Sequence, residues 1–466
     1  MAGLGGVFCA EAAIPARGIL FVNEDWYGHQ NSTVNLLYPD DPDEVYWDYR
    51  VIQAANPGKE LGCTNQYGAI WGDRLYLIAK QEKDPGATVT GGRITVADAH
   101  TLKIVKQLQL IDPSGKQCDG RAFVGVDEHK GYVSTSNGIW ILNLDTLEIE
   151  GQVEGSRNPN AGGDNDKPND DPTGALYKGQ SGTMVLAGDK VFAVHQQYGL
   201  LVVDTNEDRV VTVLDMEIVA EAIAEATGSV PEELPGIGST IVQSKDGMLW
   251  HSVSKDDQGL GSTLPYIVKV DPETLEREVI AIDGDGMYPP ANSWYAWTPD
   301  AFIASHINNE LYWCGGSNRW FSKDIIFKYD VDTGMMSKFA DLSTDAAANW
   351  HVYGCSLGID PVTDEVYASL FHEFQDPTYV VRRFDERGEA QQDYSMITNY
   401  WFPSNLIFVD ELPGREPVGV ETVTAADTDS AARYYDIYGR YIGSDASALK
   451  GLVIRVTTAG AEKVVL

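Results

Sequence analysis

Short apolar runs and polar turns alternate along most of this chain, in an order that repeats. In each unit an apolar run enters an Asp-led turn, as in Val202-Val203-Asp204. An Asp side chain can accept hydrogen bonds from backbone N–H groups two residues on, which favours a tight reversal between antiparallel strands. Seven copies of the turn occur, at Asp40, Asp98, Asp145, Asp204, Asp271, Asp330 and Asp385.

A second segment repeats with the same frequency. It is an apolar strand followed by a turn and an aromatic-rich strand, as in residues 68–77. Its copies lie 50 to 61 residues apart, a length that accommodates one four-stranded propeller blade. The copies centre on Ile70, Phe123, Met184, Ile241, Phe302, Ser356 and Leu406.

The two series are out of phase, which indicates that one repeat is divided between the two ends of the domain. The first Asp turn precedes every copy of the second segment, and the last copy, at Leu406, has no Asp turn after it. Residues 18–23 then supply a second strand and residues 403–409 supply the innermost strand of one blade. Closure of this kind leaves no open sheet edge. The pattern predicts an all-β fold, a seven-bladed β-propeller over residues 18–412, preceded by an extension over residues 1–17.

Three segments depart from the repeat. Residues 215–228 have helical spacing and end at Gly228, so they predict one surface helix between the fourth and fifth blades. Residues 158–174 are rich in Asp and Asn; a calcium site is one interpretation, and a solvated loop is the favoured one. Residues 413–466 are predicted to form a linker and a small C-terminal β module, a possible sorting or docking segment, with strands at 434–441, 451–456 and 463–466.

Charge and cysteine content exclude several classes of function. With 34 Lys and Arg against 69 Asp and Glu, the formal net charge is −35, which repels a nucleic acid. No run approaches the ~18 uninterrupted apolar residues of a membrane helix. The five cysteines are widely spaced without a CxxC pair, which argues against a c-type haem, a zinc site of that type and a disulfide framework. Isolated buried thiols are expected, and no cofactor or metal.

Several separated segments resemble one family. Residues 19–29, 66–76, 125–132 and 400–403 together look like the YncE-like propeller proteins secreted by Bacteroidetes. The resemblance implies a seven-bladed propeller located outside the cytoplasm, in the periplasm or at the outer-membrane surface. Relatives include corrinoid-capturing surface proteins of the BtuG type, so it also implies a TonB-dependent transporter as a partner. The tail, with Tyr438-Gly439-Arg440, resembles C-terminal modules of secreted Bacteroidetes proteins.

A ligand site is predicted on one face of the propeller. Innermost strands begin, and second strands end, on the same face, which we call the mouth. The mouth loops are rich in aromatic and amide side chains, which suit a flat or amphipathic organic ligand such as a sugar, a tetrapyrrole or a peptide. Any one Trp could instead pack between blades. The candidate ligand-binding residues are Trp26, Tyr27, His29, Gln66, Tyr67, Arg121, Gln180, His195, Gln196, Trp294, Tyr295, Trp297, Arg319, Trp320, Trp350, His351, His372, Tyr400 and Trp401.

Catalytic interpretations are weaker. Residues 354–358 match G-x-S-x-G, but a strand and an Asp-Pro turn surround them, and the helix of a nucleophile elbow is missing. Four mouth carboxylates, Glu24, Asp25, Asp119 and Glu373, could pair for glycoside hydrolysis. The favoured hypothesis is a non-enzymatic protein that binds a small organic ligand or a transporter. A cell-envelope interaction scaffold and a glycan-active hydrolase or lyase are the alternatives.

Overall fold

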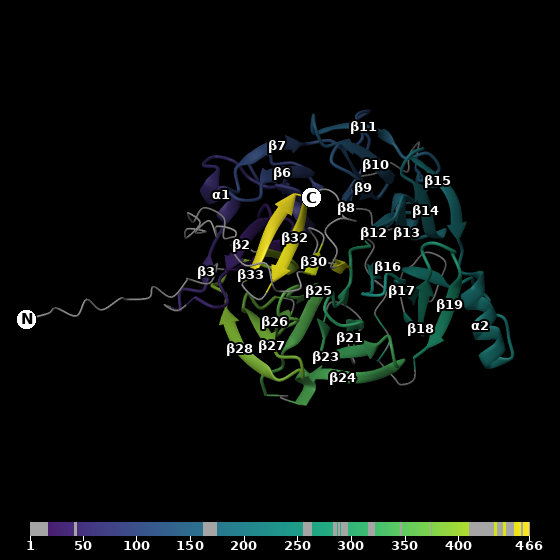
Figure 1. Ribbon diagram of the computed structural model, residues 1–466. Helices are drawn as coiled ribbons and strands as arrows, with labels where there is room; N and C mark the ends of the chain where they lie inside the picture. The colour runs from purple at the N-terminus through teal and green to yellow at the C-terminus, as the bar shows by residue number, and fades with distance from the viewer. Residues whose placement is uncertain are drawn as a thin grey trace, which may run out of the picture.

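Seven sheets form a ring around a central axis and follow one another in chain order (Figure 1). The computed structural model describes residues 17–41, 44–161, 175–254, 263–282, 287, 289, 297–315, 322–344, 347–373 and 375–409, and four later strands. The prediction of a seven-bladed β-propeller is confirmed.

Each blade is an antiparallel sheet. The first four, from the axis outward, are β29 (Pro403–Val409), β1 (Gly18–Asn23), β2 (Thr33–Leu37), β3 (Trp47–Asp48); β4 (Cys63–Trp71), β5 (Arg74–Gln81), β6 (Ile94–Asp98), β7 (Ile104–Leu108); β8 (Gly120–Gly125), β9 (Lys130–Thr135), β10 (Gly138–Asn143), β11 (Glu148–Gln152); and β12 (Ser181–Ala187), β13 (Lys190–His195), β14 (Gly199–Asp204), β15 (Arg209–Leu214). The other three are β16 (Gly236–Gln243), β17 (Leu249–Ser254), β18 (Thr263–Val270), β19 (Arg277–Ala281); β20 (Phe302–Ala304), β21 (Glu310–Gly315), β23 (Ile325–Asp330), β24 (Met335–Asp341); and β25 (His351–Ile359), β26 (Val366–Phe371), β27 (Tyr379–Phe384), β28 (Ala390–Ser395). The short strand β22 (Ser322–Lys323) adds to β25 in the seventh blade.

The first blade closes the ring with strands from both ends of the domain. In the antiparallel pair β1 and β29, Gly18 faces Val409 and Phe21 faces Leu406. The divided repeat inferred from the two out-of-phase series is therefore confirmed.

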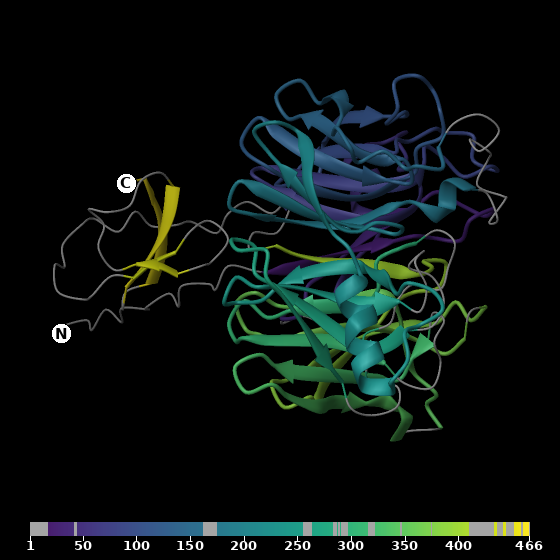
Figure 2. The ribbon, with the colours of Figure 1, turned by 90° about the vertical axis from the view of Figure 1, so that its right-hand side faces the viewer.

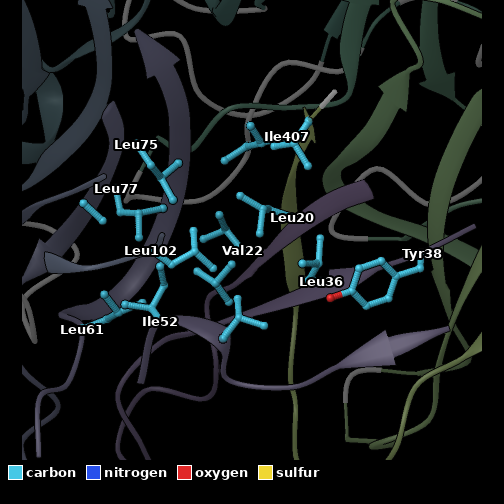
Figure 3. Packing of buried hydrophobic residues seen from close by; sticks show 14 residues of the cluster. Leu20, Val22, Leu36, Tyr38, Ile52, Leu61, Leu75, Leu77, Leu102 and Ile407 are labelled. Carbon is cyan, nitrogen blue, oxygen red and sulfur yellow. The ribbon is translucent and has the colours of Figure 1, made fainter. Parts of the chain in front are cut away.

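Seven apolar clusters hold the ring together, one at each junction between neighbouring blades. Figure 3 shows the junction of the first two blades, where Leu20 and Val22 of β1 pack with Leu75 and Leu77 of β5. The alternate residues of β1, Ile19 and Phe21, belong to the cluster shared with the seventh blade. Strands buried on both faces have continuous apolar runs, which explains the pattern in the sequence.

The Asp-led turns connect the third and fourth strands of the blades. The Asp98, Asp204 and Asp271 carboxylates each accept hydrogen bonds from the N–H groups two and three residues on. In the third blade Asn143 makes these bonds, so the assignment of that turn to Asp145 is wrong by two residues. An amide oxygen accepts the same N–H groups as a carboxylate, which is why the turn survives there.

Short elements interrupt the ring. The predicted helix is α2 (Glu217–Thr227), which ends at the left-handed Gly228 and lies on the outside of the ring (Figure 2). The helix α1 (Val51–Ala55) and two 3-10 turns, Ala175–Lys178 and Leu342–Thr344, were not expected. Neither α-helix of the described part is long and apolar enough to cross a membrane. The candidate calcium loop falls largely on residues 162–174, outside the described residues.

A separate four-stranded sheet follows the propeller in the chain. It consists of β31 (Tyr441–Gly443), β30 (Arg433–Tyr435), β32 (Leu452–Thr457) and β33 (Gly460–Val465), in that order. The expectation of one strand over residues 434–441 is wrong. The strands β30 and β31 lie at the two ends of that stretch and pair with each other in antiparallel fashion.

Candidate functional site

The innermost strands are irregular at the mouth. In six of the seven blades the pairing between the innermost and second strands shifts register near the start of the innermost strand. A bulge changes the direction in which a side chain points and interrupts the ladder, and bulges are common beside functional sites. The residues skipped by the pairing include the polar residues Gln66, Arg121, Thr183, Ser239, Ser356 and Ser404.

Some of these bulged residues link neighbouring blades. The Thr183 hydroxyl of the fourth blade accepts a hydrogen bond of 2.8 Å from the Ile241 N–H of the fifth. The Ser404 hydroxyl of the first blade donates to the Asn65 carbonyl of the second, at 3.3 Å. Residues at the mouth thus position one another across blade boundaries.

Arg121 is the centre of a buried polar network. Its side chain is about 1 % exposed, and Nη2 and Nε donate to the Gln180 amide oxygen at 2.6 and 3.2 Å. Gln180 in turn donates to the Gln196 amide oxygen, at 3.3 Å. Asp119 lies 3.7 Å from Arg121 and accepts a hydrogen bond of 3.1 Å from Arg93.

Glu24 and Lys80 extend this network toward the seventh blade. The Glu24 carboxylate accepts a hydrogen bond of 3.0 Å from the Tyr353 hydroxyl and lies near the Gln66 side chain. Burial raises the pKa of Glu24, against the opposing charge of Lys80. Burial likewise lowers the pKa of Lys80 to about 8, and the charge of Glu24 opposes that shift. We call these residues the polar core: Glu24, Gln66, Lys80, Asp119, Arg121, Gln180, Gln196 and Tyr353.

His195 is a fully buried neutral base. Its Nδ1 accepts hydrogen bonds from the Gln197 and Tyr198 N–H groups, at 3.2 and 3.1 Å, and its ring stacks on that of Tyr198. Burial lowers the pKa of His195 to about 3. In the neutral ring Nε2 carries the proton, and Nε2 has no hydrogen-bond partner among the described residues.

An aromatic shelf borders the polar core. Trp26 lies 4.9 Å from Trp401 and 4.6 Å from His29 between ring centroids, and Tyr49 stacks on Tyr400 at 5.0 Å. These five residues, which we call the aromatic shelf, are half-buried or exposed. Behind them the buried Phe402 ring stacks on Tyr353, which joins the shelf to the polar core.

Asp25 fastens the two ends of the domain together under the shelf. Its carboxylate accepts hydrogen bonds from the Trp401 N–H at 3.0 Å, from Gln30 at 2.7 Å and from the Thr33 hydroxyl at 2.7 Å. Burial of this side chain, which is 2 % exposed, raises the pKa of Asp25 to about 7.

The structure brings some of the predicted site residues together and separates others. Gln66, Arg121, Gln180 and Gln196 come together in the polar core, and Trp26, His29, Tyr400 and Trp401 come together in the shelf. Trp350 and His372 form a separate half-exposed stack at 3.7 Å, beside His351, and Tyr27 is 46 % exposed. Tyr67 packs at the edge of the cluster between the second and third blades. Trp294, Tyr295, Arg319 and Trp320 lie outside the described residues.

Trp297 requires a correction. It is fully buried in the cluster between the fourth and fifth blades, where it packs near Gly182, so it is a core residue that a ligand at the surface does not reach. A large aromatic ring before an innermost strand fits both roles in the sequence, and only burial separates them.

The candidate ligand-binding residues did not include Lys80 and Tyr353, and Glu24 and Asp119 were named only as carboxylates for glycoside hydrolysis. A signal for Lys80 was present: it is a single cation that follows the apolar run Leu75-Tyr76-Leu77-Ile78-Ala79 at the end of a buried strand. Tyr353 carried no such signal, because many tyrosines in this chain are core residues.

Comparison with known proteins identifies the family. The family model described as "Domain of unknown function (DUF5074)" matches residues 17–409, the whole of the propeller. The chain belongs to this family. A search of curated proteins finds no match. Among solved structures, the extracellular domain of a hybrid two-component system from B. thetaiotaomicron is similar over 84 % of this chain, at 11 % identity and a TM-score of 0.44. This chain spans about half of that structure, 48 % of its length.

In this DUF5074 chain the G-x-S-x-G segment lies within the strand β25. Ser356 is fully buried there, in the bulge opposite β26. A nucleophile elbow needs a sharp turn into a helix that exposes the serine, so this segment lacks the required geometry.

Proposed function

We propose that this propeller is a non-catalytic binding module whose mouth holds a small organic ligand. One observation carries the proposal: the half-exposed aromatic shelf borders a buried network of charged and amide groups at the same mouth. Rigid aromatic rings offer contact area at a small entropic cost, and convergent polar groups fix the orientation of a ligand.

The candidate carboxylates support binding over hydrolysis. Glu24, Asp25 and Asp119 are all less than 10 % exposed, and each accepts hydrogen bonds from neighbouring segments. Glu373 is exposed, in a different loop. A glycosidase needs two carboxylates on either side of an accessible bond. These three side chains instead hold the mouth together.

The finer form of the proposal is a corrinoid ligand, captured outside the cytoplasm for a TonB-dependent transporter. The resemblance of residues 19–29 and 66–76 to the YncE-like propeller proteins, whose relatives include BtuG-type proteins, supports it. A cell-envelope scaffold would use the same face to dock a protein, and a glycan-active enzyme would cleave an oligosaccharide there.

Thermal unfolding with cyanocobalamin, neutral oligosaccharides and short peptides tests the proposal. A ligand at a hundred times its Kd raises the free energy of unfolding by about 2.7 kcal/mol. We expect one of these classes to raise the melting temperature, and Trp401→Ala and Trp350→Ala to raise the Kd tenfold or more, which at the same ligand concentration removes about half of the added stability.

Trp71→Ala is the matched control, because Trp71 ends the innermost strand β4 on the face opposite the mouth. An effect of Trp71→Ala equal to those of the mouth variants would remove the mouth as the site. If the protein cleaves an oligosaccharide and Glu24→Gln abolishes that cleavage, the mouth is a hydrolytic site and the binding proposal is wrong. If the mouth binds a protein and none of the small ligands, the cell-envelope scaffold is the better hypothesis.

A further inference from the structure

Lys80 carries an ammonium group without an acceptor. It lies near the end of β5 and is only 8 % exposed. Among the described residues its ammonium makes no hydrogen bond and no ion pair. An ammonium has three N–H donors, and none of them meets an acceptor of the described residues here. The chain therefore holds a cation at the mouth whose hydrogen-bonding capacity is unused.

The nearby carboxylates are already engaged. Glu24 and Asp119 both interact with Lys80 electrostatically. Glu24 accepts a hydrogen bond from Tyr353, and Asp119 accepts one from Arg93 and lies 3.7 Å from Arg121. Each carboxylate is thus held on partners other than Lys80, so neither reaches its ammonium.

A second donor in the same network is also unused. Gln196 is fully buried, and its amide oxygen accepts hydrogen bonds from Gln180. Its amide nitrogen has no partner within the described ranges. Gln81 has an unpartnered acceptor, but it follows Lys80 in the strand and so points to the opposite face of the blade. The two groups of the polar core that lack a partner in the described part of the chain, the Lys80 ammonium and the Gln196 amide nitrogen, are thus both donors.

We propose that the ligand of the mouth carries an anionic group, a carboxylate or a phosphate, which binds against Lys80. This inference rests on the proposed binding function and specifies the chemical class of its ligand. The anion supplies the acceptors that the ammonium lacks. The aromatic shelf, joined to Glu24 through Phe402 and Tyr353, receives the flat part of the same molecule.

Three probes of one shape test the charge requirement. 2-Naphthoate, 2-naphthyl phosphate and the neutral 2-naphthamide are titrated into the full chain by calorimetry at pH 7. We expect at least one of the two anions to bind tenfold or more tightly than the amide. The stronger of the two identifies the anionic group as carboxylate or phosphate.

Two lysine variants locate the anion. Lys80→Met keeps the aliphatic stem and removes the charge, and we expect the preference for the anion to disappear. Lys190→Met is the control, because Lys190 begins the second strand of its blade on the opposite face, paired with Asp189. It should leave the preference unchanged. Melting temperatures of both variants show that the fold is retained.

The outcomes separate this inference from the function it rests on. Equal affinity for the anions and the amide, or a preference that survives in Lys80→Met, overturns the anionic site and leaves the binding function in place. If none of the three probes binds up to its solubility limit, both the anionic site and the aromatic mouth are overturned.

Discussion

Asp25 shows how a single buried carboxylate can make the stability of the ring depend on pH. It joins the loop after β1 to the segment before β29 through the Trp401 N–H, and to the start of β2 through the Thr33 hydroxyl. Burial raises its pKa from 3.8 to about 7. An unfolded chain loses this proton near pH 3.8, so the stabilisation is complete below that pH and is lost as the pH rises to about 7.

We expect Asp25→Asn to remove this dependence, because an amide does not ionise. Between pH 4.5 and 7.5 the wild-type protein should lose up to about 3 kcal/mol relative to the variant. Urea unfolding at the two pH values measures the difference. Glu373→Gln is the control: it changes an exposed carboxyl of another mouth loop, and its free energy of unfolding should depend on pH as that of the wild type does. If the free energies of unfolding of wild type and Asp25→Asn instead change in parallel with pH, Asp25 is ionised throughout this range.

At the scale of the element, each bulge interrupts a strand ladder and supplies a contact to the next blade. Ile241 N–H, in the bulged strand β16, donates to the Thr183 hydroxyl of β12 across a blade boundary. Thr183 is 7 % exposed, so this backbone donor has little access to water.

Thr183→Val should therefore destabilise the propeller by about 1–3 kcal/mol, the cost of leaving a buried N–H without an acceptor. Thr183→Ser keeps the hydroxyl and is the matched control, expected to lose less than half as much. Chemical denaturation of the three proteins measures these values. A larger loss in the serine variant than in the valine variant would assign the effect to packing of the methyl group.

The whole molecule depends on the closure of the first blade. Without β29, the strand β1 loses its inner partner, the cluster shared with the second blade loses Ile407 and Val409, and the cluster shared with the seventh blade loses Leu406 and Phe408. Each buried aliphatic side chain contributes roughly 1.5–3 kcal/mol, and a domain is stable by only about 5–15 kcal/mol.

A chain that ends at Phe402 should consequently lack a cooperative unfolding transition, as measured by circular dichroism and gel filtration. A chain that ends at Val409 keeps the closing strand and should melt within a few degrees of the full chain. Equal melting temperatures for the two truncated chains would mean that closure contributes little to stability.

The amino-acid sequence by itself determined the repeat, the number of blades and the divided first blade. These follow from local physics: a side-chain oxygen such as that of Asp204 closes its own turn, and a strand buried on both faces must be apolar along its length. The aromatic and amide side chains of the mouth loops could also be read from the sequence, because the repeat shows which loops lie on that face.

Only the tertiary structure decided which mouth residues meet, and how. Lys80, Glu24 and Arg121 come from three blades and are far apart in the sequence, and a bulge at Arg121 sets the direction of its side chain. Trp297 and Trp401 both precede an innermost strand in the sequence. Trp297 is nevertheless buried in a blade junction, whereas Trp401 is half-exposed on the shelf. Burial and hydrogen-bond partners depend on neighbouring blades, and no local pattern encodes them.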